Sequence, residues 1–247
     1  MLPGCTGKTG RSDKKKSTLI SLLTILVLIP VTLYLGIHMT GKAYYLTSTL
    51  IIIEIMLPFF VAFEHRKPQA RELVTIAVMC ALAVAARVVV QIPAFKPMLA
   101  VIMIAGIALG AEPGFLTGAI SAFASNFFFS QGPWTPWQMM AYGIAGFLSG
   151  LLFHKKRPFP GKPWLFSGLL AVYGFFAIVL LVGPLLDTCT LLTVGATVTW
   201  KFAATVYGAG LIPNLILGVA TAVTMLLLGR PLLNKLDRLR MKYGMLE

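Results

Sequence analysis

Charged residues are scarce in this chain of 247 residues, of which 12% are charged and 57% are hydrophobic. A soluble domain of this size carries about 25% charged residues. The composition therefore indicates an integral membrane protein. The formal net charge is +13, which in a soluble protein would suggest nucleic-acid binding. Here the basic residues lie between apolar runs, so we interpret them as topology signals and expect membrane lipids, not nucleic acid, as partners.

Three further absences exclude classes of chemistry. The 3 cysteines are widely scattered, which excludes a disulfide framework or a zinc site. The sequence around Lys8 lacks the first glycine of a phosphate-binding loop, so we expect no ATP site in this chain. Glu54 is the only carboxylate inside an apolar run, whereas proton relays and intramembrane metal sites use buried acids or histidines. We therefore predict no enzyme activity, no cofactor, no metal and no catalytic residue.

Apolar runs of about 20 residues predict membrane-spanning helices, and no strand-like alternation occurs between them. The fold class we expect is all-α: a polytopic membrane protein with a six-helix core and two additional N-terminal transmembrane helices. One of the apolar runs, 98–110, is short for a full crossing. The eight apolar segments are 19–37, 44–63, 73–90, 98–110, 114–128, 136–153, 164–186 and 203–229.

The distribution of lysine and arginine predicts the orientation, because cytoplasmic loops collect these residues. With the N-terminus inside, 17 of the 21 Lys and Arg residues lie on the inner side and three on the outer side. Both termini are then cytoplasmic, and loops 91–97, 125–139 and 187–201 lie outside. We divide the chain into a basic cytoplasmic segment (1–18), an extra transmembrane helix pair (19–64), a basic linker (65–72), a six-helix substrate-binding membrane core (73–229) and a basic cytoplasmic tail (230–247).

Polar and aromatic residues gather at the predicted outer ends of the last six spans. Arg87 is the clearest candidate for a functional residue, because a cation in a span faces protein or water and marks a functional site by default. Snorkelling to the interface is the alternative. Trp134 and Trp137 fit either a ligand site or the aromatic belt of a membrane protein. The neighbouring amides favour a ligand site, since a buried amide without a partner costs free energy. The predicted substrate-binding residues are Arg87, Gln91, Phe95, Lys96, Asn126, Gln131, Trp134, Trp137, Gln138 and Tyr207.

Small residues recur every four positions in several spans. Such spacing gives a smooth helix face on which another helix can approach closely. The glycine pairs predict packing within the protein, whereas the alanine ladder fits internal packing or an outside partner. The ladder is Ala77, Ala81 and Ala85, and the pairs are Gly106 with Gly110, Gly114 with Gly118, and Gly146 with Gly150.

Residues 71–229 resemble the substrate-binding S component of energy-coupling factor (ECF) transporters. The likeness lies in the six spans, the alanine ladder in the first of them, the loop QIPAFKP, the run MLAVIMIAGIALGAEPGFLTGAISAFASNFFF, the run GPWTPWQMMAYGIAGFLSGLLF and the basic loop after it. The string GPWTPWQM is the most specific of these features. The two N-terminal spans depart from the plain family pattern, and their role stays open.

The resemblance implies a protein of the bacterial plasma membrane that binds one vitamin or vitamin precursor at the outer face without hydrolysing ATP. It also implies docking onto a transmembrane coupling subunit that two ATPase subunits drive. GPWTPWQM is similar to the group assigned to cobalamin or corrinoid-related compounds. The alternative is a stand-alone secondary transporter or channel. Carried onto this sequence, the docking face is Ala77, Ala81 and Ala85, the lid residues are Phe95 and Lys96, and the pocket candidates are Asn126, Trp134, Trp137, Gln138 and Tyr207.

Overall fold

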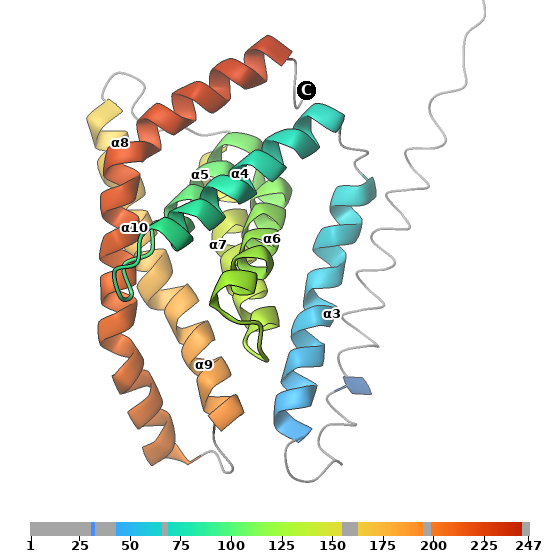
Figure 1. The fold of residues 1–247 in the computed structure, drawn as a ribbon, viewed down its shortest axis with the longest axis vertical. Coiled ribbons are helices and arrows are strands. Elements are labelled where there is room, and N and C mark those ends of the chain that lie inside the picture. The colour runs from blue at the N-terminus through green and yellow to red at the C-terminus, as the bar shows by residue number, and fades with distance from the viewer. Residues whose placement is uncertain (1–30, 33–42, 66–68, 155–162, 195–198, 244–247) are drawn as a thin grey trace, which may run out of the picture. The chain divides into compact units, whose positions relative to one another are not determined.

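The computed structural model describes residues 31–32, 43–65, 69–154, 163–194 and 199–243 (Figure 1). These residues form helices and short connections without any strand, which confirms the predicted all-α fold class for the part of the chain that is described. The N-terminal segment 1–18, most of the first predicted span and the basic loop 155–162 lie outside the described residues. The chain divides into two compact units, Met1–Pro68 and Gln69–Glu247.

The first unit contains helix α3, Ala43–His65, where the sequence predicts a span over 44–63. Glu54 lies in the middle of this helix and is half-buried. Its Oε1 accepts a hydrogen bond from the Thr32 hydroxyl, 22 positions earlier in the sequence. The intramembrane carboxylate is therefore tied to a neutral side chain of its own unit.

The second unit contains six helical segments in the part of Gln69–Glu247 that the structure describes. Three of its helices are long and apolar enough to cross a membrane, as counted over the described residues: Ala70–Val89, Trp164–Thr193 and Trp200–Leu239. The elements are α4 (Ala70–Val89), α5 (Met98–Leu109), α6 (Ala111–Phe129), α7 (Thr135–Phe153), α8 (Pro163–Ala177), the π-helical turn η2 (Ile178–Val182), α9 (Gly183–Val194) and α10 (Trp200–Tyr243).

Helix α5 is the centre of the core. All 12 of its residues are buried, which explains why its sequence is apolar on every side. Gly110 ends the helix with a φ of 111°, a conformation that glycine adopts without the steric cost of a Cβ atom. The chain therefore reverses directly from α5 into α6.

Glycines bring α5, α6 and α7 into backbone contact, as the glycine spacing predicts. A Cβ atom on Gly106 would lie 2.1 Å from the carbonyl oxygen of Gly146, and one on Gly146 would lie 2.2 Å from the carbonyl oxygen of Gly114. A Cβ atom on Gly118 would lie 2.2 Å from the carbonyl oxygen of Tyr142. These contacts confirm that the glycines pack helices within the protein. They also allow the backbones of α6 and α7 to lie in close contact.

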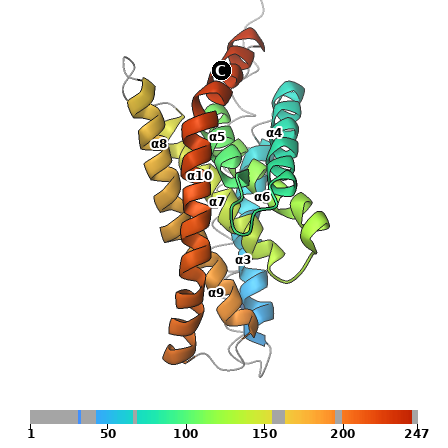
Figure 2. The same ribbon diagram turned by 60° about the vertical axis from the view of Figure 1, so that its left-hand side comes forward.

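The last two spans are longer than the sequence predicts. Helix α8, η2 and α9 continue one another from Pro163 to Val194, so Asp187 lies inside a helix and not in the expected outer loop. Helix α10 extends over 44 residues and includes Pro213 and Pro231. Residues 230–243 of the predicted tail thus form the end of α10, which is inclined to the rest of this helix (Figures 1 and 2).

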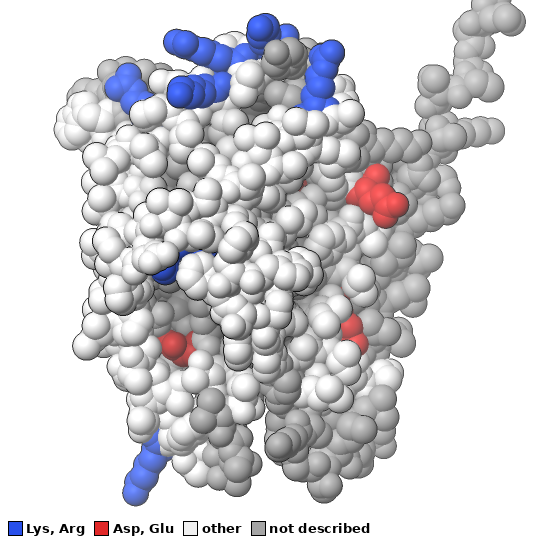
Figure 3. Space-filling model, in the orientation of Figure 1, with Lys and Arg blue, Asp and Glu red and all other residues white. Residues whose placement is uncertain are grey.

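The ends of the core differ in charge. Helix α4 begins at the end of the core where α10 ends, and most of the Lys and Arg side chains of the described residues lie at this end (Figures 1 and 3). The turn between α6 and α7, the end of α9 and the start of α10 lie toward the opposite end (Figure 1). Of the predicted ligand-binding residues, Gln131 and Trp134 belong to the turn between α6 and α7, and Tyr207 belongs to the first turns of α10.

Candidate ligand-binding site

Arg87 lies in the last turn of α4 and is half-buried. Its Nη1 donates hydrogen bonds to the hydroxyl of Ser125 and, over 2.9 Å, to the Oδ1 of Asn126. Both partners lie on α6 and have no exposed surface. Arg87 therefore turns into the protein instead of snorkelling to the interface, and within the described residues no carboxylate forms an ion pair with it.

Asn126 joins three helices through its side-chain amide. Its Oδ1 accepts from Arg87 on α4, and its Nδ2 donates to the Oε1 of Gln138 over 2.8 Å and to the hydroxyl of Thr135 over 3.1 Å, both on α7. The side chain is fully buried. Because Asn126 is fully buried, it could affect a ligand only through the side chains that it holds in place.

The loop between α6 and α7 is tied to the same network. The Thr135 hydroxyl donates to the Oε1 of Gln131 over 2.9 Å, and the Nε2 of Gln131 donates to the carbonyl oxygen of Phe123 over 3.0 Å. Gln131 is exposed. We name the connected side chains of this network the Arg87 cluster: Arg87, Ser125, Asn126, Gln131, Thr135 and Gln138.

The two tryptophans of GPWTPWQM differ in environment. Trp137 is buried, and its indole Nε1 has no hydrogen-bond partner among the described residues. Trp134 is 40% exposed, and a Cβ atom on Gly132 would lie 2.5 Å from its ring. Gly132 therefore makes room for the Trp134 ring over the loop, while Trp137 presents an unused donor inside the protein.

Loop 91–97 contacts the Arg87 cluster through the aromatic ring of Phe129. The Lys96 Nζ donates to the carbonyl oxygen of Val90 over 2.8 Å and lies 5.3 Å from the centroid of the Phe129 ring. The guanidinium carbon of Arg87 lies 4.8 Å from the same centroid. Phe129 is therefore shared by both cations through cation–π contacts.

Two other predicted residues of this region, Gln91 and Phe95, do not belong to the Arg87 cluster. Gln91 is exposed, although its spacing places it on the same helical side as Arg87, and Phe95 is half-buried. The Gln91 side chain makes no hydrogen bond with the residues that the structure describes. Both residues lie on or beside the loop that precedes α5.

Tyr207 belongs to a second set of polar residues between α9 and α10. Its hydroxyl lies 2.8 Å from the hydroxyl of Thr188, and the Nδ2 of Asn214 donates to the Oδ2 of Asp187 over 2.8 Å. We name these four residues the Tyr207 cluster. No hydrogen bond joins it to the Arg87 cluster in the described part of the chain. The structure thus joins four of the predicted residues, Arg87, Asn126, Gln131 and Gln138, in one network and leaves Tyr207 in a separate group.

The sequence reasoning missed four residues of these clusters. Ser125 and Thr135 are small hydroxyl residues that hydropathy does not distinguish, although they flank Asn126 and the tryptophans. Asp187 and Thr188 follow an apolar run, and an acid in that position resembles the start of a loop. Gly183, four residues before Asp187, leaves room for the partner of that acid, because a Cβ atom on Gly183 would lie 2.5 Å from the Cγ of Asn214.

The alanine ladder occupies the outward face of α4. Ala77, Ala81 and Ala85 are exposed, whereas the buried face of the same helix contains Ile76, Met79, Cys80 and Ala83. The ladder therefore does not pack against the core of this unit.

The family model for the S component of ECF-type riboflavin transporters matches residues 67–237. No curated protein and no solved structure matches the chain. The matched residues cover more than half of the sequence and contain both polar clusters and the whole of α4 to α9. They also contain the motifs on which the resemblance to S components depends. The chain therefore belongs to the family of S components of ECF-type riboflavin transporters, a family of membrane transport proteins.

Proposed function

We propose that this chain binds a vitamin at the outer end of its six-helix core and that the Arg87 cluster is part of the binding site. The observation that carries the proposal is the state of Arg87. This half-buried cation is held by two neutral side chains, with no carboxylate partner among the described residues. Such a charge is costly within a membrane and marks a functional position. Arg87 has further N–H groups with which to meet a carbonyl or anionic group of a ligand.

The surroundings of Arg87 supply the other elements of a ligand pocket, namely apolar walls with a few placed polar groups. Phe129 and Trp134 offer partly exposed rings for stacking. The buried indole N–H of Trp137 lacks an acceptor, which is unfavourable until an acceptor arrives. Loop 91–97, with Phe95 and Lys96, acts as the lid in this proposal.

Riboflavin is the first candidate ligand, because the matching family is described by riboflavin transport. Its flat heterocycle suits stacking on aromatic rings, and its carbonyl groups suit Arg87. Cobalamin or a corrinoid-related compound is the second candidate, favoured by the string GPWTPWQM. The Tyr207 cluster would contact a ligand long enough to reach from α7 to α10.

Equilibrium binding by the purified chain tests the site. Arg87→Gln should weaken riboflavin binding by about 10- to 100-fold, since hydrogen bonds to charged groups contribute about 1.5–3 kcal/mol. Arg230→Gln removes an exposed cation from the opposite end of the core and is the matched control, with unchanged affinity expected. Equal affinities of wild type and Arg87→Gln for riboflavin would refute the assignment of Arg87. Tight binding of a corrinoid with none of riboflavin would select the second ligand.

We further propose that α4 docks onto an ECF coupling subunit with two ATPase subunits through Ala77, Ala81 and Ala85. In this arrangement the basic end of the core and both termini are cytoplasmic. Ala81→Leu should keep vitamin binding and abolish ATP-dependent uptake in liposomes that contain all subunits. Ala209→Leu, at an exposed position of α10, is the control. Concentrative uptake by the chain alone would instead establish the alternative, a stand-alone transporter.

A further inference from the structure

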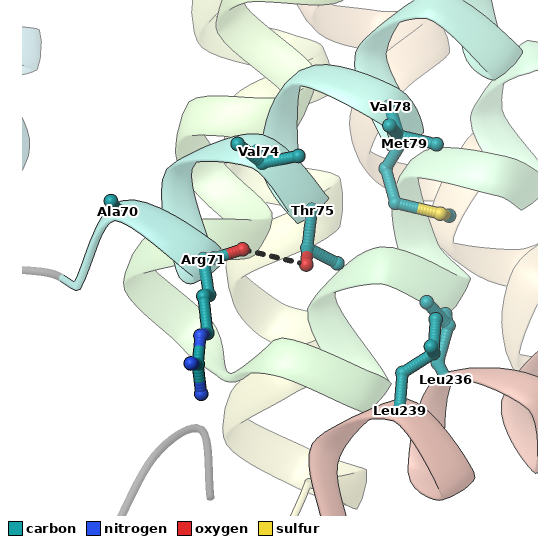
Figure 4. A pocket seen from close by; sticks show the side chains of 8 residues that line it. All are labelled: Ala70, Arg71, Val74, Thr75, Val78, Met79, Leu236 and Leu239. Atoms are coloured by element: carbon teal, nitrogen blue, oxygen red, sulfur yellow. Dashed lines mark hydrogen bonds between the residues drawn. The ribbon is translucent and has the colours of Figure 1, made fainter. Parts of the chain in front are cut away.

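An apolar groove lies far along α4 from the Arg87 cluster. It has a volume of about 400 Å³ and opens between the first turns of α4 and the last turns of α10. Met79 of α4 faces Leu236 and Leu239 of α10 across it, and Arg71 lies at its edge (Figure 4). The complete lining is Ala70, Arg71, Val74, Thr75, Val78, Met79, Leu236 and Leu239.

The walls of the groove offer almost no hydrogen-bonding group. The only hydroxyl in the lining, that of Thr75, already donates to the carbonyl oxygen of Arg71 over 2.9 Å (Figure 4). Val74 and Val78 are 62% and 58% exposed. An occupant of the groove therefore needs a hydrocarbon part and gains nothing from polar groups along that part.

The rim of the groove is cationic. Arg71 is exposed on α4, and Lys235, Arg238 and Lys242 are exposed on α10. Spacings of three and four residues place the last three on one side of the helix, next to the leucines that line the groove. Two carboxylates, those of Glu72 on α4 and Asp237 on α10, lie among these four cations, so the rim keeps a net positive charge. Figure 3 shows Lys and Arg side chains gathered at this end of the core.

The groove extends from the ends of two candidate spans toward their interior. Its α4 lining runs from Ala70, the first residue of the span Ala70–Val89, to Met79 in the middle of that span, and its α10 lining is at the end of the span Trp200–Leu239. An amphiphile here would place its chain in the groove and its head group beside the cations. At the end that we propose to be cytoplasmic, a basic pocket between transmembrane helices is typical of a site for anionic lipid head groups.

We infer that this groove binds one acyl chain of an anionic glycerophospholipid, with the phosphate held by Arg71 and the basic residues at the end of α10. Charge complementarity at the rim and the apolar lining select a lipid over a soluble anion. This lipid site is separate from the vitamin site and does not depend on which vitamin is bound.

Native mass spectrometry of the purified full chain tests the inference by titration with phosphatidylglycerol and phosphatidylcholine that carry identical acyl chains. We expect wild type to prefer the anionic lipid by at least about fivefold, since each basic residue near a membrane surface contributes about 1 kcal/mol. Arg71→Gln should lower this preference by about fivefold. Lys201→Gln, at the start of α10, should leave it unchanged. An equal preference in wild type and Arg71→Gln would overturn the inference.

A second pair of variants tests the acyl chain. Val78→Trp and Leu239→Trp fill the groove from opposite walls, and each should reduce binding of both lipids while riboflavin affinity matches that of wild type. Soluble glycerol phosphate at millimolar concentration should not displace the lipid; if it does, the site binds a free anion and the inference is wrong. If the tryptophan variants bind both lipids normally and lose only association with the coupling subunit, the occupant is a protein and the inference is again wrong.

Discussion

The two polar clusters of the core differ in how they are built. The Arg87 cluster joins three helices, and its hub, Asn126, has no exposed surface. The Tyr207 cluster joins two helices through two separate side-chain pairs, and all of its members retain exposed surface. Polar networks with a buried hub hold one arrangement, whereas partly solvated pairs can exchange partners with water or ligand. The comparison indicates that the Arg87 cluster and the helices that carry it, α4, α6 and α7, are rigid, and we name this region the rigid wall. The Tyr207 cluster on α9 and α10 is more adaptable, and we name that region the adaptable wall.

Substitution of Asn126, the amide hub of the Arg87 cluster, should reveal the largest difference in stability between the two clusters. Asn126→Ala leaves Arg87 and Gln138 without their partner, and we expect the free energy of unfolding to fall by about 3 kcal/mol, because unsatisfied buried groups cost about 1–3 kcal/mol each. Asn214→Ala removes one partly solvated bond and should cost about 1 kcal/mol. Thermal unfolding of the two purified variants in the same detergent compares them. Equal losses would mean that the Tyr207 cluster is as rigid as the Arg87 cluster.

The glycines beside the clusters provide the next test. A Cβ atom on Gly118 meets the backbone carbonyl of Tyr142, whereas one on Gly210 meets the Asp187 carboxylate, each at 2.2 Å. A side chain can rotate away and a backbone in a packed helix cannot, so Gly118→Ala should cost about 2 kcal/mol through overpacking. In Gly210→Ala the gain in helix propensity, about 1 kcal/mol, should offset the displaced hydrogen bond. Thermal unfolding should show a clear loss for the first variant and almost none for the second.

The rigid wall was largely predictable from the sequence, and the adaptable wall was not. Arg87, Asn126, Gln131 and Gln138 stand out because polar side chains in apolar runs need partners, and the structure joins them. Hydropathy could not supply the identity of those partners, since Ser125 resembles its neutral neighbours. It also could not place Gln91, which shares a helical side with Arg87 and yet remains exposed.

The helix ends show why the second wall was missed. The apolar run that begins at Trp164 was expected to stop at Leu186, because an acid usually ends a span. The structure continues the helix through the π turn η2 to Val194. Glycines on both helices, Gly183 and Gly210, accommodate the Asn214–Asp187 pair. The compensation for Asp187 thus comes from a helix more than 20 residues away in the sequence, and no local pattern reveals it.

Measurements of riboflavin affinity should reveal a smaller difference between the two walls than the stability measurements do. Tyr207→Phe removes a hydroxyl that already pairs with Thr188 at a partly exposed position. We expect riboflavin affinity to fall by about threefold, consistent with the lower range of a neutral hydrogen bond, and therefore less than in Arg87→Gln. Titration calorimetry of the single and double variants measures both effects. Additive losses are expected for separate contacts, whereas a strong coupling energy would show that the two clusters act as one site.

The smallest effect concerns the loop that covers the rigid wall. Ala94 has a φ of 58°, a left-handed conformation that costs a residue with a Cβ atom roughly 1–2 kcal/mol. Ala94→Gly removes this strain but also makes the unfolded chain more flexible, which costs about 0.4–1 kcal/mol. The free energy of unfolding should therefore change by less than about 1 kcal/mol. Ala94→Val, with a branched side chain at the same φ, should destabilise the loop. If hydrogen exchange in loop 91–97 is the same in both variants, the left-handed turn at Ala94 does not hold the loop against Phe129, and the contacts of Lys96 alone position it.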